Sequence, residues 1–210
     1  MGVAERRERE RQARKGIVLE AARHLLLEKG FRGTTTKEVA KRCELSEATL
    51  FFYFKNKDEI LVSLLFESIT FWEAGLAKLE KSRLSPEKLL DKIWQFHETV
   101  NDEHPEYYVV SAYLAQPNAL VGVSDEIKEK IVHLSGENFQ RLAALLERAT
   151  GSDNGPHLAD TLWSTFLGLM ILRDSRINLG HEEVRTEKRD RTAVFETIKY
   201  GLVVASKETQ

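Results

Sequence analysis

The 210-residue sequence has a single cysteine, Cys43, and only four prolines. One cysteine excludes an intramolecular disulfide and any cysteine-rich zinc site, which favours a reducing compartment. No uninterrupted apolar run reaches the roughly 18 residues that a membrane span needs. The first residues alternate Arg and Glu, without the apolar segment that a signal peptide would have. These absences predict a cytoplasmic protein with no membrane partner.

Period-two runs of β-branched residues are also scarce, whereas apolar residues recur at helical spacing along the whole chain. Apolar residues make up 42% of the sequence and charged residues 30%, enough for a packed core and a hydrated surface. We therefore expect an all-α fold. The spacing predicts helices over residues 6–28, 35–43, 47–54, 58–81, 86–101, 105–117, 125–150, 156–179 and 190–206.

The charge is unevenly divided, although the net charge is only −2. Residues 1–57 hold 14 Lys and Arg against 8 Asp and Glu, a net of +6. The remaining residues hold 17 against 25, a net of −8. A basic head on an acidic body is typical of a nucleic-acid-binding domain joined to another domain, although chance solvation of helix faces gives the same pattern. We predict domains at 1–57 and 58–210.

Two short helices close together form the most informative motif. Thr35 and Glu38 have the spacing of a capping box, which predicts a reciprocal pair of hydrogen bonds at the start of the first helix. Ser46 is placed to cap the second helix. Two short helices joined by a tight turn are the helix-turn-helix geometry, in which the second helix enters the major groove of DNA.

The residue types on these helices suit DNA. Thr35, Thr36 and Lys37 lie at a helix N-terminus, where amides, hydroxyls and the helix dipole favour a phosphate, and Lys57 lies at the start of the next helix. In the second short helix, Leu50 and Phe54 share one face and should pack inward. Thr49, Phe52 and Tyr53 lie on or near the opposite face, where they could contact bases, thymine methyl groups or phosphates.

The stretch from Gly30-Phe31 to Leu61 resembles the DNA-binding domain of the TetR family. The resemblance covers residues 14–62 and is most specific in the run Tyr53-Phe54-Lys55-Asn56-Lys57-Asp58-Glu59-Ile60-Leu61. It implies an all-helical homodimer whose C-terminal domain binds a ligand that releases the DNA. It also implies that Thr35, Thr49, Tyr53 and Lys57 contact DNA.

Three positions depart from the family pattern. Glu44 stands in the turn where the family usually has Gly, so mild backbone strain is expected there. Phe51 replaces a frequent Tyr and removes one hydroxyl. Glu47 stands where Lys is frequent, and it would favour the helix dipole or accept a hydrogen bond from cytosine.

Residues 5–15 form a segment in which Arg alternates with Glu. One interpretation is an arm that contacts phosphates or a minor groove, and we assign that role to Arg14 and Lys15, nearest the folded domain. The alternative, which the interleaved Glu residues support, is a solvated helix extension held by salt bridges.

The C-terminal body is rich in large aromatic residues, most of which are expected to form ordinary core. We predict that Trp94, His97, Tyr113, Trp163 and Phe166 lie near an apolar effector cavity, as in ligand sites between bundled helices. The apolar helix at 156–179, with Val194, Ile198, Leu202 and Val203, could build a two-fold four-helix interface, or be buried within one chain.

Signals of catalysis or metal binding are weak. The G-x-S-x-G, Gly-rich phosphate-loop and H-E-x-x-H motifs do not occur. His24 with Glu28, and His133 with Glu137, have the spacing of a metal pair, but such pairs are usually surface neighbours. We expect no enzyme activity, no cofactor and no metal.

The prediction from the sequence is thus a three-helix helix-turn-helix domain followed by a helical ligand-binding and dimerisation bundle. The expected function is a transcriptional repressor released from double-stranded operator DNA by a small apolar molecule. The alternative is a helical small-molecule-binding or interaction protein that no longer reads DNA.

Overall fold

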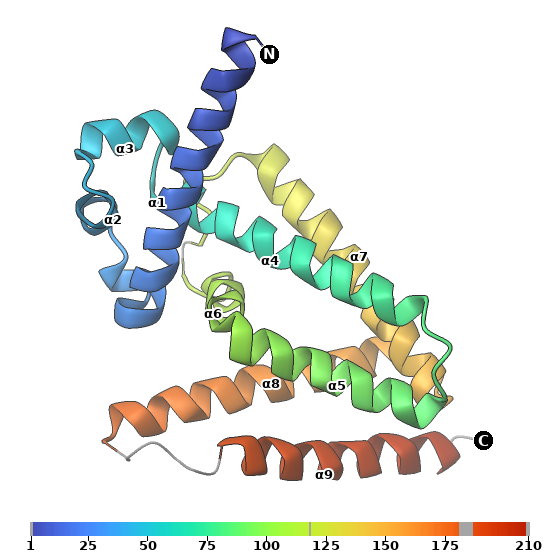
Figure 1. The fold of residues 1–210 in the computed structure, drawn as a ribbon. Helices are drawn as coiled ribbons and strands as arrows, with labels where there is room; N and C mark the ends of the chain where they lie inside the picture. The colour runs from blue at the N-terminus through green and yellow to red at the C-terminus, as the bar shows by residue number, and fades with distance from the viewer. Residues whose placement is uncertain (1, 118, 181–186, 209–210) are drawn as a thin grey trace. The chain divides into compact units, whose positions relative to one another are not determined.

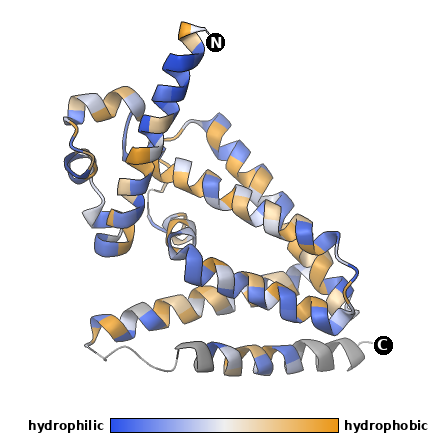
Figure 2. Ribbon diagram, viewed as in Figure 1, coloured by the Kyte–Doolittle hydropathy of each residue, from blue (hydrophilic) through white to orange (hydrophobic). Residues whose placement is uncertain are grey.

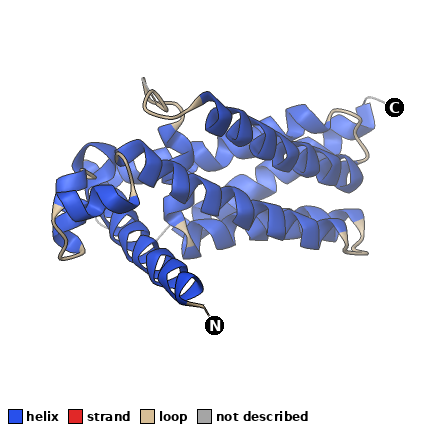
Figure 3. Cartoon of the chain, turned by 90° about the horizontal axis from the view of Figure 1, so that it is seen from above, coloured by secondary structure: helices blue, strands red, loops and turns tan. Residues whose placement is uncertain are grey.

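A computed structural model describes residues 2–117, 119–180 and 187–208, without the side chains of 174, 187–190 and 202–208. Every regular element in these residues is an α-helix (Figures 1 and 3). The helices are α1 (Val3–Gly33), α2 (Thr36–Arg42), α3 (Glu47–Tyr53), α4 (Lys57–Glu80), α5 (Pro86–Glu103), α6 (Pro105–Tyr113), α7 (Asp125–Thr150), α8 (Gly155–Asn178) and α9 (Glu187–Glu208). The all-α prediction is confirmed.

The chain packs as two compact units. The first consists of Met1–Thr70 and His104–Val132, and the second of Phe71–Glu103 and His133–Gln210. The helices α4 and α7 each contribute one part to each unit. The first unit thus contains the two short helices together with α6 and the first part of α4. The predicted division at residue 57 stays a prediction about independent domains.

The core of the first unit is built around α1. Its buried residues are small or aliphatic and recur at helical spacing: Val18, Ala21, Ala22, Leu25 and Leu26. Ile17, which directly precedes Val18, is apolar but 48% exposed, so it lies outside this core. The first buried position of α1 is Val18.

Gly30 ends the regular part of α1, two residues after the predicted end of this helix at residue 28. Its φ of 63° lies in the left-handed region, and the amide of Thr34 donates to its carbonyl oxygen. The three residues after it complete one more turn, which brings the chain to the start of α2.

The core of the second unit is aromatic. Trp94 and Phe166 have ring centroids 4.4 Å apart, and Phe195 stacks on Trp94 at 4.6 Å. These contacts join α5, α8 and α9. Large aromatic rings bury much apolar area each, so this cluster stabilises the packing of these three helices.

The helix α4 is long and apolar enough to cross a membrane by length and composition alone, but half of its most apolar window is buried in the protein. Ile60, Leu61 and Leu64 are at most 2% exposed. Glu67 on the same helix pairs with an arginine of α1. Burial and ion pairing of this kind are typical of a core helix, and α4 is such a helix.

Candidate DNA-binding surface

The two short helices are capped by their own side chains. The Thr35 hydroxyl accepts a hydrogen bond from the Glu38 amide at 3.2 Å, and the Ser46 hydroxyl accepts one from the Thr49 amide at 3.1 Å. The capping box also predicted that the Thr35 amide donates to the Glu38 carboxylate, and this second hydrogen bond does not form. The Glu38 carboxylate instead accepts from the Lys29 ammonium at 2.6 Å, because a charged donor makes a stronger hydrogen bond than an amide.

The turn between α2 and α3 contains a non-glycine residue with positive φ. Glu44 has a φ of 56°, and the next amide, of Leu45, donates to the carbonyl of Ala40 at 2.9 Å. This hydrogen bond closes the turn and requires the left-handed conformation at Glu44. The strain expected there from the sequence is present.

One face of α3 is buried and the other is exposed. Leu50 is fully buried and Phe54 is 2% exposed, as predicted. Phe52 is 73% exposed, Thr49 is exposed and Tyr53 is half-buried, with its ring edge-on to Phe52 at 5.6 Å. A phenylalanine this exposed gains nothing from the core, so its ring is available to a partner.

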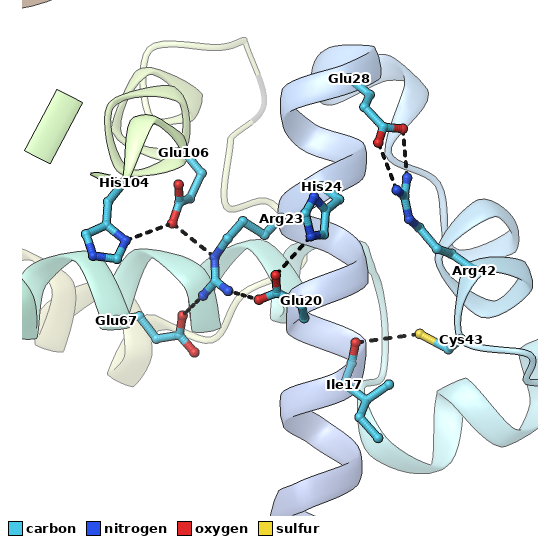
Figure 4. Close-up of polar contacts among 10 residues, drawn as sticks. All are labelled: Ile17, Glu20, Arg23, His24, Glu28, Arg42, Cys43, Glu67, His104 and Glu106. Carbon is cyan, nitrogen blue, oxygen red and sulfur yellow. Dashed lines mark hydrogen bonds and ion pairs between the residues drawn. The ribbon is translucent and has the colours of Figure 1, made fainter. Parts of the chain in front are cut away.

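Polar contacts fix α2 against α1 (Figure 4). Arg42 makes a bidentate pair with Glu28, with N–O distances of 2.7 and 2.8 Å. The Cys43 thiol donates to the carbonyl of Ile17 at 3.8 Å, and burial raises the pKa of this thiol. Cys43 is thus a packing residue with a protonated thiol.

The N-terminal part of α1 shares a groove with α3. Arg7, Arg11 and Arg14 line this groove together with Phe52 and Tyr53, and Glu8 and Glu10 lie among them. The segment is strongly hydrophilic (Figure 2). Arg14 is exposed beside the outward face of α3, whereas Lys15 is half-buried with its ammonium 5.0 Å above the Phe54 ring. The structure brings Arg14 to the exposed face and directs Lys15 toward the edge of the core.

Residues 18–64 match the sequence model of a family described as "Bacterial regulatory proteins, tetR family". The match covers α2, α3 and the parts of α1 and α4 that pack on them. The chain is similar to that family over these residues, which include the two short helices of the helix-turn-helix.

Three further proteins are similar to this chain. The uncharacterized HTH-type transcriptional regulator YvkB of Bacillus subtilis is 52% identical over 48 residues, 23% of this chain and 25% of that protein. The fatty acid metabolism regulator protein of B. subtilis is 27% identical over 115 residues, 54% and 56% of the two chains. The crystal structure of the transcriptional regulator FadR from B. subtilis in complex with stearoyl-CoA has a TM-score of 0.61 and 18% identity, and covers 89% of this chain and 96% of that one.

The curated relatives are thus matched over only 17–60% of their own lengths, whereas the solved TetR-type structure is matched along nearly all of its chain. At 18% identity the structural likeness establishes the fold. The TetR fold, with an N-terminal helix-turn-helix and a C-terminal helical domain, is therefore shown.

Two of the residues predicted to contact DNA have partners within the protein that the sequence did not predict. The Thr36 hydroxyl donates to the Glu47 carboxylate at 3.2 Å, so Glu47 ties α2 to α3. The Lys57 ammonium donates to the carbonyl of Phe31, and burial lowers the pKa of Lys57 while Asp58 opposes the shift. An ammonium has three N–H donors, so Lys57 keeps donors for a phosphate. Thr35 and Lys37 are exposed.

A cluster of charges joins α1 to α4 and α6 (Figure 4). Arg23 lies between Glu20, Glu67 and the buried Glu106, at 2.6 Å from Glu67 and 3.0 Å from Glu106. The contact to Glu106 is an ion pair without hydrogen-bond geometry. Burial alone would lower the pKa of Arg23, but Glu67, Glu20 and Glu106 outweigh it and raise the pKa. No spacing in the sequence predicts this cluster, because Glu67 and Glu106 are far from Arg23 in the chain.

The five residues predicted near an effector cavity fall into two groups. Trp94, His97, Trp163 and Phe166 come together in the second unit, where the His97 ring stacks on Phe166 at 4.5 Å. The prediction did not hold for Tyr113, which lies in the first unit. Its hydroxyl donates to Asp58 at 2.7 Å and its ring packs on Phe31 at 5.5 Å, so its hydroxyl is used to hold the start of α4.

A cavity of about 330 Å³ lies beside this aromatic cluster in the second unit. Of the five predicted residues, Phe166 is among those that line it. Trp94 and His97 are at most 2% exposed and belong to the packed core. The lining also includes Asn101 and Arg191, for which the sequence pattern held no signal.

The two candidate metal pairs form ordinary contacts. His24 pairs with Glu20 at 3.0 Å, because Glu28 is occupied by Arg42, and His133 lies 3.6 Å from Glu137 on the surface. Among the described residues there is no group of three His, Cys, Asp or Glu placed to hold a metal ion.

Proposed function

We propose that this protein is a DNA-binding transcriptional regulator, a repressor that a small apolar molecule releases from its operator. The observation that carries the proposal is the surface of the first unit. Phe52, Thr49 and Arg14 are exposed there, while Leu50 and Phe54 on the opposite side of α3 form core. The match of residues 18–64 to the tetR family supports the same role.

The proposed contacts are divided by their chemistry. Thr35, Thr36, Lys37, Lys57, Arg14 and Lys15 would hold the DNA backbone, and Thr49, Phe52 and Tyr53 would contact bases or phosphates. Contacts to phosphate release counterions and therefore depend steeply on salt. Contacts to base edges or thymine methyl groups change the preference among sequences.

The test is fluorescence anisotropy with labelled duplexes from the region upstream of the protein's own gene, at two salt concentrations. We expect Arg14→Ala to weaken binding about equally on all duplexes. It should also make the binding constant fall less steeply as the salt concentration rises. Phe52→Ala should alter the ranking of the duplexes. Glu10→Gln is the matched control in the same groove, and it should not weaken binding.

If the intact protein bound every duplex weakly and without salt dependence, the proposal would be wrong. The protein would then be a helical binding protein that no longer reads DNA. The acidic residues Glu44 and Glu47 were the sequence features behind that alternative. Glu47 now has another explanation, since it holds Thr36 and the two short helices together.

The effector is proposed to be a long-chain acyl compound. One relative is named a fatty acid metabolism regulator, and one solved structure of the same fold holds stearoyl-CoA. The cavity of the second unit has an apolar wall that includes Phe166, Leu169 and Met170. Its volume is at the lower end of the range of small-molecule sites, about 300–1,000 Å³.

We also propose a cytoplasmic homodimer. On α8, Ile171 and Leu172 are 64% and 53% exposed, and on α9 Tyr200 is 74% exposed. Apolar side chains exposed on two adjacent helices are typical of an interface between copies. Leu202 and Val203, also predicted there, lie outside the described side chains. Sedimentation of the protein and of Ile171→Glu tests this interface: a monomeric wild type would contradict it.

A further inference from the structure

The N-terminal turns of α1 carry an arginine stripe, formed by Arg7, Arg11 and Arg14. These residues precede the buried Val18 at steps of four, three and four positions, the spacing that keeps side chains on one face of a helix. Further along α1 the same face holds the buried Leu25 and belongs to the core. Before Val18 this face is exposed and charged. A face of this composition suits an anionic partner and not the protein's own core.

The acidic residues on either side of the arginine stripe are held away from it. The Gln12 amide donates to the Glu8 carboxylate at 2.6 Å, and Glu10 pairs with Arg6 at 3.1 Å. Both partners lie on other faces of the helix, because neither has the spacing of the stripe. Within the part of the chain that the structure describes, the three arginines of the stripe make no hydrogen bond or ion pair through their side chains. Their N–H donors are therefore available to a ligand.

The arginine stripe borders the surface of α3 that is proposed to contact bases. Its three arginines line one groove together with Phe52 and Tyr53, and Phe52 is 73% exposed. From Arg7 to Arg14 the helix rises by about 10 Å. Over that length a DNA duplex carries about six phosphate charges. Guanidinium groups match phosphates because they present planar pairs of N–H donors.

We infer that the arginine stripe binds the phosphate backbone of double-stranded DNA beside the bases that α3 contacts. This inference rests on the proposed function, and it adds Arg7 and Arg11 to the contact already proposed for Arg14. Phosphates carry no sequence information, so the stripe contributes affinity and orientation and no preference among sequences. Insertion of the same arginines into a minor groove would instead depend on the flanking sequence, and the experiment separates the two.

Fluorescence anisotropy of the full chain on labelled duplexes, at several salt concentrations, tests the inference. Arg7→Gln/Arg11→Gln should weaken binding at least tenfold. It should also reduce the slope of log binding constant against log salt by about 2, since each phosphate contact contributes about 0.9. The matched control, Arg6→Gln/Arg9→Gln, removes the same charge from other faces of the same turns and should lose less than half as much in both measurements. Equal losses in the two double variants would mean general electrostatic attraction and would overturn the inference.

Duplexes with one uncharged methylphosphonate linkage, moved along each strand, locate the contact. At a phosphate that the stripe binds, the substitution should weaken the wild type and the control. It should leave Arg7→Gln/Arg11→Gln unaffected, because that variant has already lost the contact. If no linkage behaved in this way, the inference would be wrong. A loss that instead followed the flanking base sequence would indicate the minor groove and would overturn the phosphate contact.

Circular dichroism shows whether both double variants keep the helix content of the wild type, which is expected because all four arginines are exposed. A wild type that bound no duplex in a salt-dependent manner would remove the regulator function and this inference together. Salt-dependent binding by the wild type, with the two double variants behaving alike, would remove the arginine stripe alone.

Discussion

Arg23 on α1 lies 3.0 Å from Glu106 on α6, and only 3% of the Glu106 side chain is exposed. A buried carboxylate depends on a positive partner, because transferring an uncompensated charge from water is costly. Arg23 also holds Glu67 of α4 and is 23% exposed, so one guanidinium links three helices of the first unit.

Replacing Arg23 should therefore destabilise the protein more than replacing its acids. We expect Arg23→Met to lower the free energy of unfolding by about 3 kcal/mol, since it leaves the buried Glu106 without its arginine and with only His104 beside it, at 3.4 Å. The double variant Arg23→Met/Glu106→Gln should recover much of this loss. Urea unfolding measures the free energy of unfolding of both variants.

The matched control is Glu20→Gln, because Glu20 contacts the same arginine but is 53% exposed. An exposed pair contributes under about 1 kcal/mol, so this variant should be nearly neutral. If the double variant were no more stable than Arg23→Met, the charge of Glu106 would not be the cause of the destabilisation by Arg23→Met.

The turn of the helix-turn-helix allows a stabilising substitution. Glu44 has a φ of 56°, which costs a residue with a side chain roughly 1–2 kcal/mol. Glu44→Gly should raise the free energy of unfolding by about 1 kcal/mol, because part of the relief is lost to the flexibility of glycine in the unfolded chain. Glu44→Ala keeps the side-chain clash and should give no gain. A similar gain from both variants would show that the charge of Glu44, and not its backbone, is unfavourable.

His97 should make stability depend on pH. Complete burial lowers its pKa to about 3, against about 6.5 in the unfolded chain. Between these values the unfolded chain binds a proton that the folded protein does not. The stabilising contribution is therefore complete above about pH 6.5 and falls as the pH drops below it, by about 1 kcal/mol per pH unit.

Denaturant unfolding from pH 7 to pH 4 compares the wild type with His97→Gln and with His157→Gln. The His97 variant should show a flatter decline of stability with falling pH. The control His157 is an exposed histidine of the same unit, and its variant should keep the wild-type slope. Parallel curves for all three proteins would show that His97 is not the titrating group.

Gly75 is needed for close packing of α4 on α5. A Cβ atom built there would lie 2.0 Å from Cζ of Phe96, well inside contact distance. Gly75→Ala should lower the free energy of unfolding by about 2 kcal/mol through overpacking. In α7, Gly136 has no atom within 4 Å of such a Cβ, so Gly136→Ala should instead stabilise by about 0.5–1 kcal/mol. Calorimetric melting of both variants tests this contrast, and a loss in both would contradict it.

Local sequence signals predicted the elements well. Ser46 caps α3, Gly30 has the left-handed conformation that ends a helix, and Leu50 and Phe54 face inward. Each of these features depends on residues within one or two turns, so spacing and residue type suffice to predict it. The charge of the first 57 residues and the run around Tyr53 likewise pointed to the TetR-type domain that the comparisons show.

Contacts between distant residues were decided by the tertiary structure. Glu38 pairs with Lys29 rather than with the amide of Thr35, Lys57 donates to Phe31, and Tyr113 belongs to the first unit. In each case the group takes a partner at least nine residues away in the chain. Which partner it takes depends on distances that the linear order does not contain.

The amino-acid sequence by itself determined the helices, their caps and the inward face of α3, because these follow from periodicity and short-range hydrogen bonding. Only the tertiary structure decided that Arg23 joins three helices and that Asn101 and Arg191 line the same cavity. Such groupings arise when packed helices bring together side chains that are tens of residues apart in the sequence. Burial then removes water from their polar and charged groups, so that the pairing of these groups affects stability more than it does in the extended chain.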